Sequence, residues 1–281
     1  MKLMTVNTHS LVGEDFPLRA EAFFESILLE LPDVIAMQEV NQTPDAPVVD
    51  SDTVSRFVSS GVSIPLREDN YAYWLWRKLS EEGISYYWTW FPIKRGYGRY
   101  DEGLATFSRL PIDAVETVYL SPNRDYEDWH TRAALAIQCG ARGEWFYNAH
   151  MSRWSGQGGF MDEWKRLKGS FSTKESLWLM GDLNNPAEVR DEGYDTVTKD
   201  GFFDAYLLAK DRSGEATARR GIDGWGDGNA DDGLRIDHVW CSERREILRY
   251  RTVFDGKDLP VVSDHFGVIV EAESKQGRGG F

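Results

Sequence analysis

The feature that most constrains this chain is a set of short apolar runs, each followed within two residues by a polar residue that can do chemistry. Residues 3–6 lead to Asn7, residues 177–180 lead to Asp182, and a third run leads to Glu39. Apolar runs of this length are typical of strands buried on both faces. A fold with several such strands needs covering layers, and it gathers these polar residues at strand ends, where loops carry sites.

Other patterns place the remaining elements. Apolar residues recur at helical spacing over residues 20–31, and Pro32 ends that helix. Asp69 or Asn70 can cap a second helix that stops before Gly83. Strands are further predicted at 85–91, 103–107, 115–120, 133–138, 145–149, 236–241, 247–254 and 268–271, a third helix at 161–171, and loops at 41–67, 151–160 and 211–233. Because strands outnumber helices and lie close together in sequence, we expect mixed, partly antiparallel sheets.

The charge of the chain bears on its partners. The net charge is -14, and affinity for nucleic acid depends largely on Lys and Arg at phosphates, so a small substrate is expected rather than nucleic acid.

No window approaches the ~20 apolar residues of a membrane helix, and the N-terminus resembles a strand rather than a signal peptide. Cys139 and Cys241 lie in predicted strands, as reduced buried thiols do. We expect a cytoplasmic protein with no membrane partner, and its oligomeric state stays open.

Histidines gather in the same polar segments. Four of the five lie there, namely His9, His150, His238 and His265. One histidine alone is more often structural, and one Asn or Asp after a strand is usually a turn residue, but the whole set indicates a site. Carboxylate and amide oxygens suit Mg²⁺ or Mn²⁺, which polarises a phosphoryl oxygen. A histidine whose tautomer is fixed by a carboxylate can move a proton near neutral pH, and Asp237 and Asp264 are the candidates for that orienting role.

Seven segments, in this order, resemble the endonuclease/exonuclease/phosphatase superfamily. They are TVNTH at 5–9, AMQEV at 36–40, EGLATFSRLPI at 102–112, NAHMSRW at 148–154, GDLNN at 181–185, IDHVW at 236–240 and SDHFGV at 263–268. The resemblance implies an α/β fold: a four-layer sandwich of two mixed β-sheets face to face, flanked by helices. We expect residues 1–272 to form this single domain and residues 273–281 to form a disordered tail.

The resemblance also implies a metal site. Glu39 would be the main ligand of Mg²⁺, with Mn²⁺ as the alternative, helped by Asn7 and with Asp264 nearby. Many members have an acidic residue two positions after the first Asn, where this chain has His9. That departure leaves the number of metal ions open.

Catalytic roles follow from the same resemblance. His265 would deprotonate the attacking water and Asp237 would orient it, although some schemes give the base role to the Asp at the position of Asp182. Asp182 and Asn184 would hold the nucleophile and the phosphate. His150 would hydrogen-bond the phosphate and stabilise the transition state.

The finer pattern is similar to a bacterial subgroup, the maltose 6'-phosphate phosphatases, cytoplasmic enzymes of carbohydrate metabolism. The segments are VNTHS, EDWHTRAAL, NAHMSRW, DGFFDAY, and DGWGDGN before LRIDHVW. This implies hydrolysis of a phosphorylated disaccharide to free sugar and phosphate. Arg132, Arg153 and Arg95 are candidates for a phosphate fork, and His9 and Trp154 for further substrate contacts. A stacking wall for the sugar can be sought among Trp88, Trp90, Tyr97, Tyr100, Trp129, Trp154 and Trp225.

Two other functions stay open. A phosphodiesterase, either a nuclease or a sphingomyelinase-like enzyme, would act on the same chemistry. A nuclease is expected to show a basic groove, and the nearest arginine cluster, at 244–251, alternates like a strand. A binding module on an inactive fold fits poorly, because the expected catalytic positions are filled apart from the variable one at His9.

Overall fold

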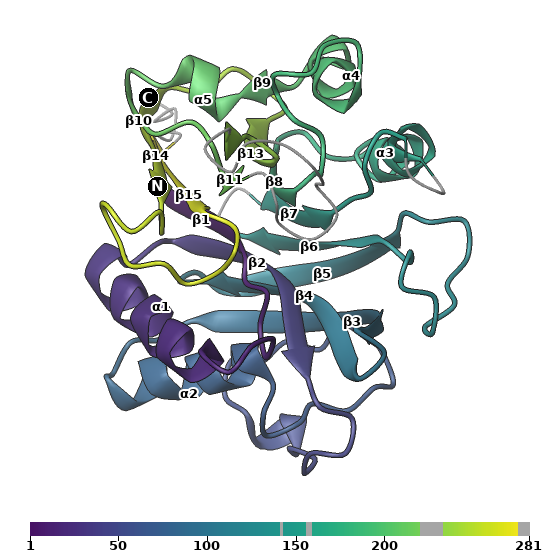
Figure 1. The fold of residues 1–281 in the computed structure, drawn as a ribbon, viewed down its shortest axis with the longest axis vertical. Coiled ribbons are helices and arrows are strands. Elements are labelled where there is room, and N and C mark those ends of the chain that lie inside the picture. The colour runs from purple at the N-terminus through teal and green to yellow at the C-terminus, as the bar shows by residue number, and fades with distance from the viewer. Residues whose placement is uncertain (141–142, 156–158, 220–232, 275–281) are drawn as a thin grey trace, which may run out of the picture.

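Two mixed sheets form the centre of the molecule (Figure 1). The computed structural model describes residues 1–140, 143–155, 159–219 and 233–274. The first sheet has the order β10 (Asp211–Ser213), β14 (Ile247–Val253), β15 (Gly267–Ala272), β1 (Lys2–Asn7), β2 (Val34–Gln42), β4 (Tyr100–Ser108), β3 (Tyr87–Gly96). The second has the order β5 (Ile112–Tyr119), β6 (Ala133–Cys139), β7 (Glu144–His150), β8 (Leu177–Asp182), β13 (Asp237–Cys241), β9 (Phe203–Asp204). A small ribbon pairs β11 (Ala218–Arg219) with β12 (Gly233–Leu234).

Helices cover the outer face of each sheet. The helices α1 (Phe16–Glu30) and α2 (Tyr71–Glu81) lie on the side of the first sheet, and α3 (Phe160–Gly169) and α4 (Gly193–Lys199) lie on the opposite side of the molecule (Figure 1). A short α5 (Ala205–Leu208) and a 3₁₀ turn at Ser51–Thr53 complete the helices of the described residues. The predicted four-layer α/β sandwich is therefore confirmed.

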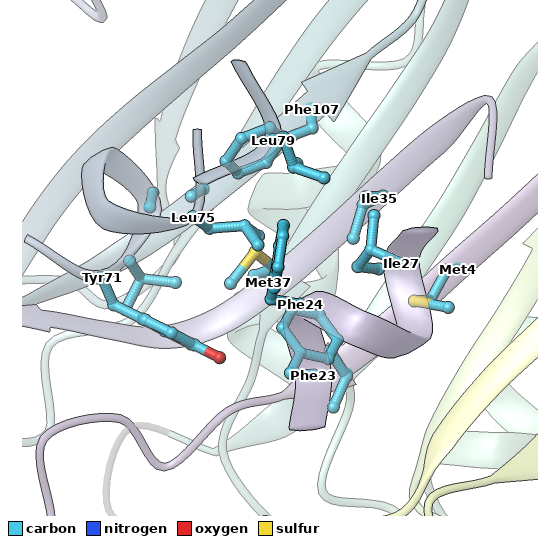
Figure 2. Packing of buried hydrophobic residues seen from close by; sticks show 14 of the residues in the cluster. Met4, Phe23, Phe24, Ile27, Ile35, Met37, Tyr71, Leu75, Leu79 and Phe107 are labelled. Atoms are coloured by element: carbon cyan, nitrogen blue, oxygen red, sulfur yellow. The ribbon is translucent and has the colours of Figure 1, made fainter. Parts of the chain in front are cut away.

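Apolar side chains hold the layers together. Leu3 and Ala36 of the first sheet share one buried cluster with Trp178 and Met180 of the second, which is the interior of the sandwich. A second cluster joins the helices to the first sheet (Figure 2), and its labelled members are Met4, Phe23, Phe24, Ile27, Ile35, Met37, Tyr71, Leu75, Leu79 and Phe107. Since burial of such side chains drives folding, the apolar runs fix which faces of the sheets meet.

The register of the strands brings the polar strand ends together. In the first sheet Asn7 lies opposite Gln38. In the second sheet His150 and Asp237 both lie opposite Asp182, because β8 is parallel to β7 and antiparallel to β13. Three candidate site residues therefore stand side by side on neighbouring strands.

Several element boundaries differ from the predictions. The strand β2 runs on to Gln42, so the loop predicted at 41–67 begins two residues later than predicted, and Glu39 lies inside a strand. The loop predicted at 211–233 contains the short strands β10, β11 and part of β12, and α4 and α5 were not predicted. The predicted disordered tail lies outside the described residues from 275 onward, as do Trp225 and the rest of 220–232. Among the described residues no helix is both long and apolar enough to cross a membrane.

Candidate active site

A β-bulge turns Glu39 toward the strand ends. The pairing of β2 with β4 shifts between Met37 and Val40, and Glu39 has φ 52°. His9 and Asn184 also have positive φ, at 41° and 50°. Because non-glycine residues in this region store strain, and strain of this kind gathers at functional sites, the three residues mark the same region of the molecule.

A buried amide clamp holds the two sheets in register beside the bulge. Gln38 Nε2 donates to Asn148 Oδ1 at 2.7 Å, and Asn148 Nδ2 donates to the backbone oxygens of Met37 and Ala105 at 3.0 and 2.9 Å. Gln38 and Asn148 join the two sheets beside Glu39 on one and close to His150 on the other. The clamp therefore fixes the relative position of the two strands that carry these residues.

Asp182 is the hub of the polar cluster. Its Oδ2 accepts from Asn7 Nδ2 at 3.2 Å and lies 3.6 Å from His150 Nε2 and 3.9 Å from His265 Nε2. Its Oδ1 accepts from the backbone N–H of Asn184 at 2.9 Å. The carboxylate is 2% exposed, so any group that reaches it from the pocket enters a largely dry environment.

Gly181, next to Asp182, allows β8 to lie close to β7. Its φ is 138°, and a Cβ atom there would lie 2.0 Å from the backbone oxygen of Ala149. Any larger residue would push β8 away from β7. The Gly-Asp pair at the end of β8 is thus a packing requirement as well as a chemical one.

His265 and Asp237 form a buried pair. His265 Nδ1 lies 3.0 Å from Asp237 Oδ2, and both side chains are at most 7% exposed. Burial favours the neutral imidazole, but the charges of Asp237 and Asp182 outweigh it and raise the pKa of His265 to about 10. Burial and the charge of Asp237 raise the pKa of Asp182 to about 7. The imidazole is therefore held in one orientation, with Nε2 turned toward Asp182.

His150 is held in the neutral form. Burial and the nearby charge of Arg132 place the pKa of His150 well below its ordinary value. A neutral imidazole donates from only one ring nitrogen. Its Nε2 faces Asp182, so this histidine can hydrogen-bond a ligand without adding a charge.

Glu39 offers a carboxylate to a cation. Oε1 accepts from Asn7 Nδ2 at 2.9 Å, whereas the buried Oε2 makes no hydrogen bond and faces His9 Nδ1 at 3.4 Å. Burial opposes ionisation, but His9 and the Asn7 amide outweigh it and hold the pKa of Glu39 below its usual range. An ionised, buried oxygen without a donor fits a metal ligand, because an uncompensated buried charge is costly.

The other two residues assigned to the metal fit it less directly. Asp264 Oδ2 lies 3.8 Å from His9 Nδ1, so His9 stands between the carboxylates of Glu39 and Asp264. Burial favours the neutral imidazole, but these two carboxylates outweigh it and raise the pKa of His9. Asn7 Oδ1 accepts from the backbone N–H of His9 at 3.2 Å, so its amide nitrogen, not its oxygen, faces Glu39. Of the three residues assigned to the metal, Glu39 has the surroundings that best fit a metal ligand.

A pocket of about 720 Å³ opens over this cluster. It is lined by Glu39, Lys94, Gly96, Tyr97, Gly98, Glu102, Trp129, His130, Arg132, His150, Ser152, Arg153, Ser155, Asp182 and Asn184. This volume is within the ~300–1,000 Å³ that encloses a drug-sized ligand. The pocket therefore has room for a group much larger than a phosphate.

The predicted substrate residues separate into two groups. Arg132 and Arg153 line the pocket, and the buried Nε of Arg132 has no hydrogen-bond partner. Trp154 instead packs against the apolar cluster beneath α3, with its ring 6.3 Å from that of Phe160. Among the other aromatic residues, Trp88 and Trp90 lie in the core, whereas Tyr97 and Trp129 line the pocket.

Sequence reasoning missed Lys94 and Glu102. They lie opposite each other on β3 and β4, and their side chains form an ion pair at 3.2 Å on the pocket wall. Both residues lie outside the strands predicted at 85–91 and 103–107, so nothing in the sequence indicated that they would be buried and paired.

His238 lies apart from this cluster. Its Nε2 is 3.0 Å from the backbone oxygen of Asn185 and its Nδ1 is 3.5 Å from Arg235. Burial and the charge of Arg235 lower the pKa of His238 to about 4. The residue is therefore neutral and structural at pH 7.

His238 should make the fold acid-sensitive. Below pH ~6.5 the unfolded chain binds a proton at this residue, while the native protein does not until pH ~4, so falling pH favours unfolding. The shift corresponds to roughly 3 kcal/mol of stability lost between pH 6.5 and pH 4. We expect His238→Gln, which stays neutral, to show a shallower decline in the free energy of unfolding, measured by urea titration at several pH values. Parallel pH curves for the two proteins would contradict this.

Comparisons with known proteins agree with this fold. Residues 4–265 match the model of the Endonuclease/Exonuclease/phosphatase family. A family protein from Leptotrichia buccalis C-1013-b is 27% identical with a TM-score of 0.85, over 98% of this chain and 100% of that one. A mannosyl-6-phosphatase from Bacteroides thetaiotaomicron VPI-5482 is 18% identical with a TM-score of 0.63, over 98% and 100% of the two chains.

A third solved structure contains DNA. A 3' phosphatase from Neisseria, bound to a product DNA hairpin, is 17% identical with a TM-score of 0.61, over 98% of this chain and 100% of that one. No curated protein matches the sequence. At these two lower identities the likeness shows the fold alone, whereas the family model spans nearly the whole chain. The chain belongs to the endonuclease/exonuclease/phosphatase family, whose members are divalent-metal-dependent hydrolytic phosphoesterases.

Proposed function

We propose that this protein is a Mg²⁺-dependent phosphatase that hydrolyses a sugar phosphate, with a maltose 6'-phosphate-like disaccharide as the preferred substrate. The observation that carries the proposal is the pocket itself. It joins the Asp182 cluster to Glu39 at its base and to Lys94 and Arg132 on its wall. Such a site can bind a compact, doubly charged group next to a space for a leaving group.

The charges around the pocket favour a phosphate monoester. Lys94 and Arg132 both act on the buried His150, so both cations lie near the cluster. A monoester carries up to two negative charges near neutral pH and a diester carries one, so a site with two nearby cations and a metal ligand suits the monoester better. The net charge of -14 also argues against a long polyanion as the substrate.

Each residue of the cluster has a proposed part in the reaction. Glu39, with Asn7 and Asp264, would hold the ion, and oxygen ligands of this kind suit Mg²⁺ more than softer metals. The ion, when bound, neutralises charge that develops on the phosphoryl oxygens. His265, oriented by Asp237, is the proposed acceptor of a proton from the attacking water; it can accept only in its neutral form, which its raised pKa disfavours. Asp182, with a pKa of about 7, is the alternative acceptor.

His150, Asn184 and Arg132 would steady the phosphoryl group. His150 is neutral and buried, so it can donate a hydrogen bond to a phosphoryl oxygen without losing a proton. Asn184 lines the pocket together with Asp182. The unpartnered Nε of Arg132 leaves part of its guanidinium for an anion. Arg153 lines the same pocket and His9 adjoins Glu39, so these two keep their proposed substrate contacts, while Trp154 would contribute only by packing.

The likeness to solved phosphatases supports this choice without fixing it. The Bacteroides structure is named as a mannosyl-6-phosphatase, which points to a sugar monoester, whereas the Neisseria structure is a DNA 3' phosphatase. A cytoplasmic location goes with a phosphorylated sugar, because charged sugars of this kind do not cross membranes unaided. A phosphodiesterase acting on nucleic acid is the second candidate.

The test is release of inorganic phosphate in the presence of Mg²⁺. We expect maltose 6'-phosphate to be hydrolysed faster than glucose 6-phosphate, an inositol phosphate or an oligonucleotide with an abasic site, and a chelator to abolish the reaction until Mg²⁺ is restored. Cleavage of the oligonucleotide without phosphate release from either sugar would replace this proposal with the phosphodiesterase.

A further inference from the structure

A buried ion pair lies on the pocket wall, and its carboxylate has no part in the proposed chemistry. Lys94 on β3 and Glu102 on β4 occupy paired positions, and Lys94 Nζ lies 3.2 Å from Glu102 Oε1. The two side chains are only 7% and 8% exposed, and both line the pocket. In the hydrolysis described above Lys94 serves only as a nearby positive charge, and Glu102 has no role.

Fold stability is a weak reason for such a pair. Burial, together with Arg132, lowers the pKa of Lys94, and burial raises the pKa of Glu102. Burial therefore disfavours the charged form of each group. Replacing a buried ion pair by apolar residues of similar volume is often neutral or stabilising. A pair that does little for stability and faces a pocket suggests a ligand.

The surroundings hold the carboxylate in a defined place. A Cβ atom on Gly96 would lie 2.3 Å from Glu102 Oε2, so the missing side chain leaves the space that the carboxylate fills. Gly96 itself lines the pocket. The backbone is thus shaped around Glu102 at this point of the wall.

Lys94 joins the pair to an exposed indole. Its Nζ donates to the backbone oxygen of Trp129 at 2.9 Å. Trp129 is 61% exposed, lines the pocket, and has its ring 3.7 Å from that of His130. The pocket therefore passes from the buried Asp182 cluster, by way of a charged pair, to an aromatic face at the solvent.

A carboxylate, an ammonium and an indole together match the chemistry of a sugar ring. A carboxylate accepts hydrogen bonds from hydroxyls, an ammonium donates to them, and an indole face packs against apolar C–H groups. A phosphate would be repelled by Glu102, so this part of the pocket suits an uncharged, hydroxylated group.

We infer that Lys94, Glu102 and Trp129 form a subsite for the leaving group, one that binds a pyranose ring beyond the phosphate and sets the preference for sugar esters. The inference rests on the proposed phosphatase function, whose substrate class it makes specific. These residues determine specificity; none of them touches the bond that breaks.

Two variants test the subsite against a substrate without hydroxyls. Glu102→Gln keeps the shape but removes the charge, and Trp129→Ala removes an exposed ring whose loss should not disturb folding. For Glu102→Gln we expect kcat/KM for maltose 6'-phosphate, relative to propyl phosphate, to fall at least about tenfold, the effect of a lost hydrogen bond to a charged group. For Trp129→Ala the same ratio should also fall, because the variant loses the apolar contact with the sugar ring. Glu30→Gln, which weakens an ion pair with Lys2 and Arg251 outside the pocket, should leave the ratio unchanged.

Binding of free maltose gives a readout that does not depend on hydrolysis. Titration calorimetry should detect maltose binding to the wild type, and weaker binding to Glu102→Gln and Trp129→Ala. If both variants keep the wild-type substrate ratio and bind maltose equally well, the subsite is overturned. If the wild type releases phosphate from no ester but binds maltose through these residues, the proposed function fails and the sugar subsite stands. Wild-type protein that releases phosphate but binds no maltose refutes the subsite alone.

Discussion

Replacing His265 by glutamine is expected to lower the rate of phosphate release by about 10²–10⁴-fold, the usual contribution of general acid–base catalysis. Glutamine cannot take a proton at neutral pH, so the variant loses the proposed base. Its amide can still donate to Asp237, which is fully buried and would otherwise be left without its partner. His265→Gln should therefore lose less stability than His265→Ala, which leaves Asp237 with no partner at this position, and its remaining loss reflects the charge that Asp237 and Asp182 stabilise in the wild type.

A second buried histidine supplies the control. His238→Gln makes the same change at a residue that contacts Asn185 and Arg235 rather than Asp182. Its kcat at pH 7 should equal that of the wild type. A folded His265→Gln enzyme with wild-type kcat would remove His265 from the reaction and leave Asp182 as the proton acceptor, which Asp182→Asn would then test.

The layers of the fold could be predicted because they follow from local patterns. The apolar runs at 3–6 and 177–180 have strand length, and both lie in the interior strands that the sequence predicted. Asn70 caps α2 as expected, by accepting from the backbone N–H of Tyr73 at 3.1 Å. The helices α4 and α5 were missed because seven and four residues are too few to show a helical period.

The site was harder to predict, since its geometry depends on tertiary register. A β-bulge has no clear sequence signature, so nothing in AMQEV showed that Glu39 would sit inside a strand with φ 52°. Lys94 meets Glu102 only because β3 pairs with β4 in one particular register. Trp154 was a candidate for the substrate wall, yet it packs under α3, because which way an aromatic side chain turns is decided by the layers around it. The roles of the remaining site residues stay predictions.

Glu39→Gln should have an effect as large as that at His265, through the metal. The substitution removes the charge of a pocket carboxylate whose buried Oε2 has no hydrogen-bond partner, while keeping its size and its contact with the Asn7 amide. Loss of a residue that only supports a ligand typically lowers metal affinity about 10–100-fold, so loss of the ligand itself should lower it more. The variant should therefore release phosphate only at Mg²⁺ concentrations far above those that the wild type needs.

Thermal unfolding separates a metal ligand from a residue that merely aids catalysis. An ion that binds only the native state stabilises it by RT ln(1 + [L]/Kd), about 2.7 kcal/mol at a hundredfold excess over Kd. The melting temperature of the wild type should therefore rise as Mg²⁺ is added. It should rise less for Glu39→Asp, which keeps the charge. Glu39→Gln should show almost none over the same range. If its melting temperature rises with Mg²⁺ as the wild type's does, the ion is held elsewhere. The buried group of Asp182, Asp237 and His265, whose ligand atoms lie within 4.8 Å of one another, would then be the place to look, and His265 could not be the free base that the first prediction requires.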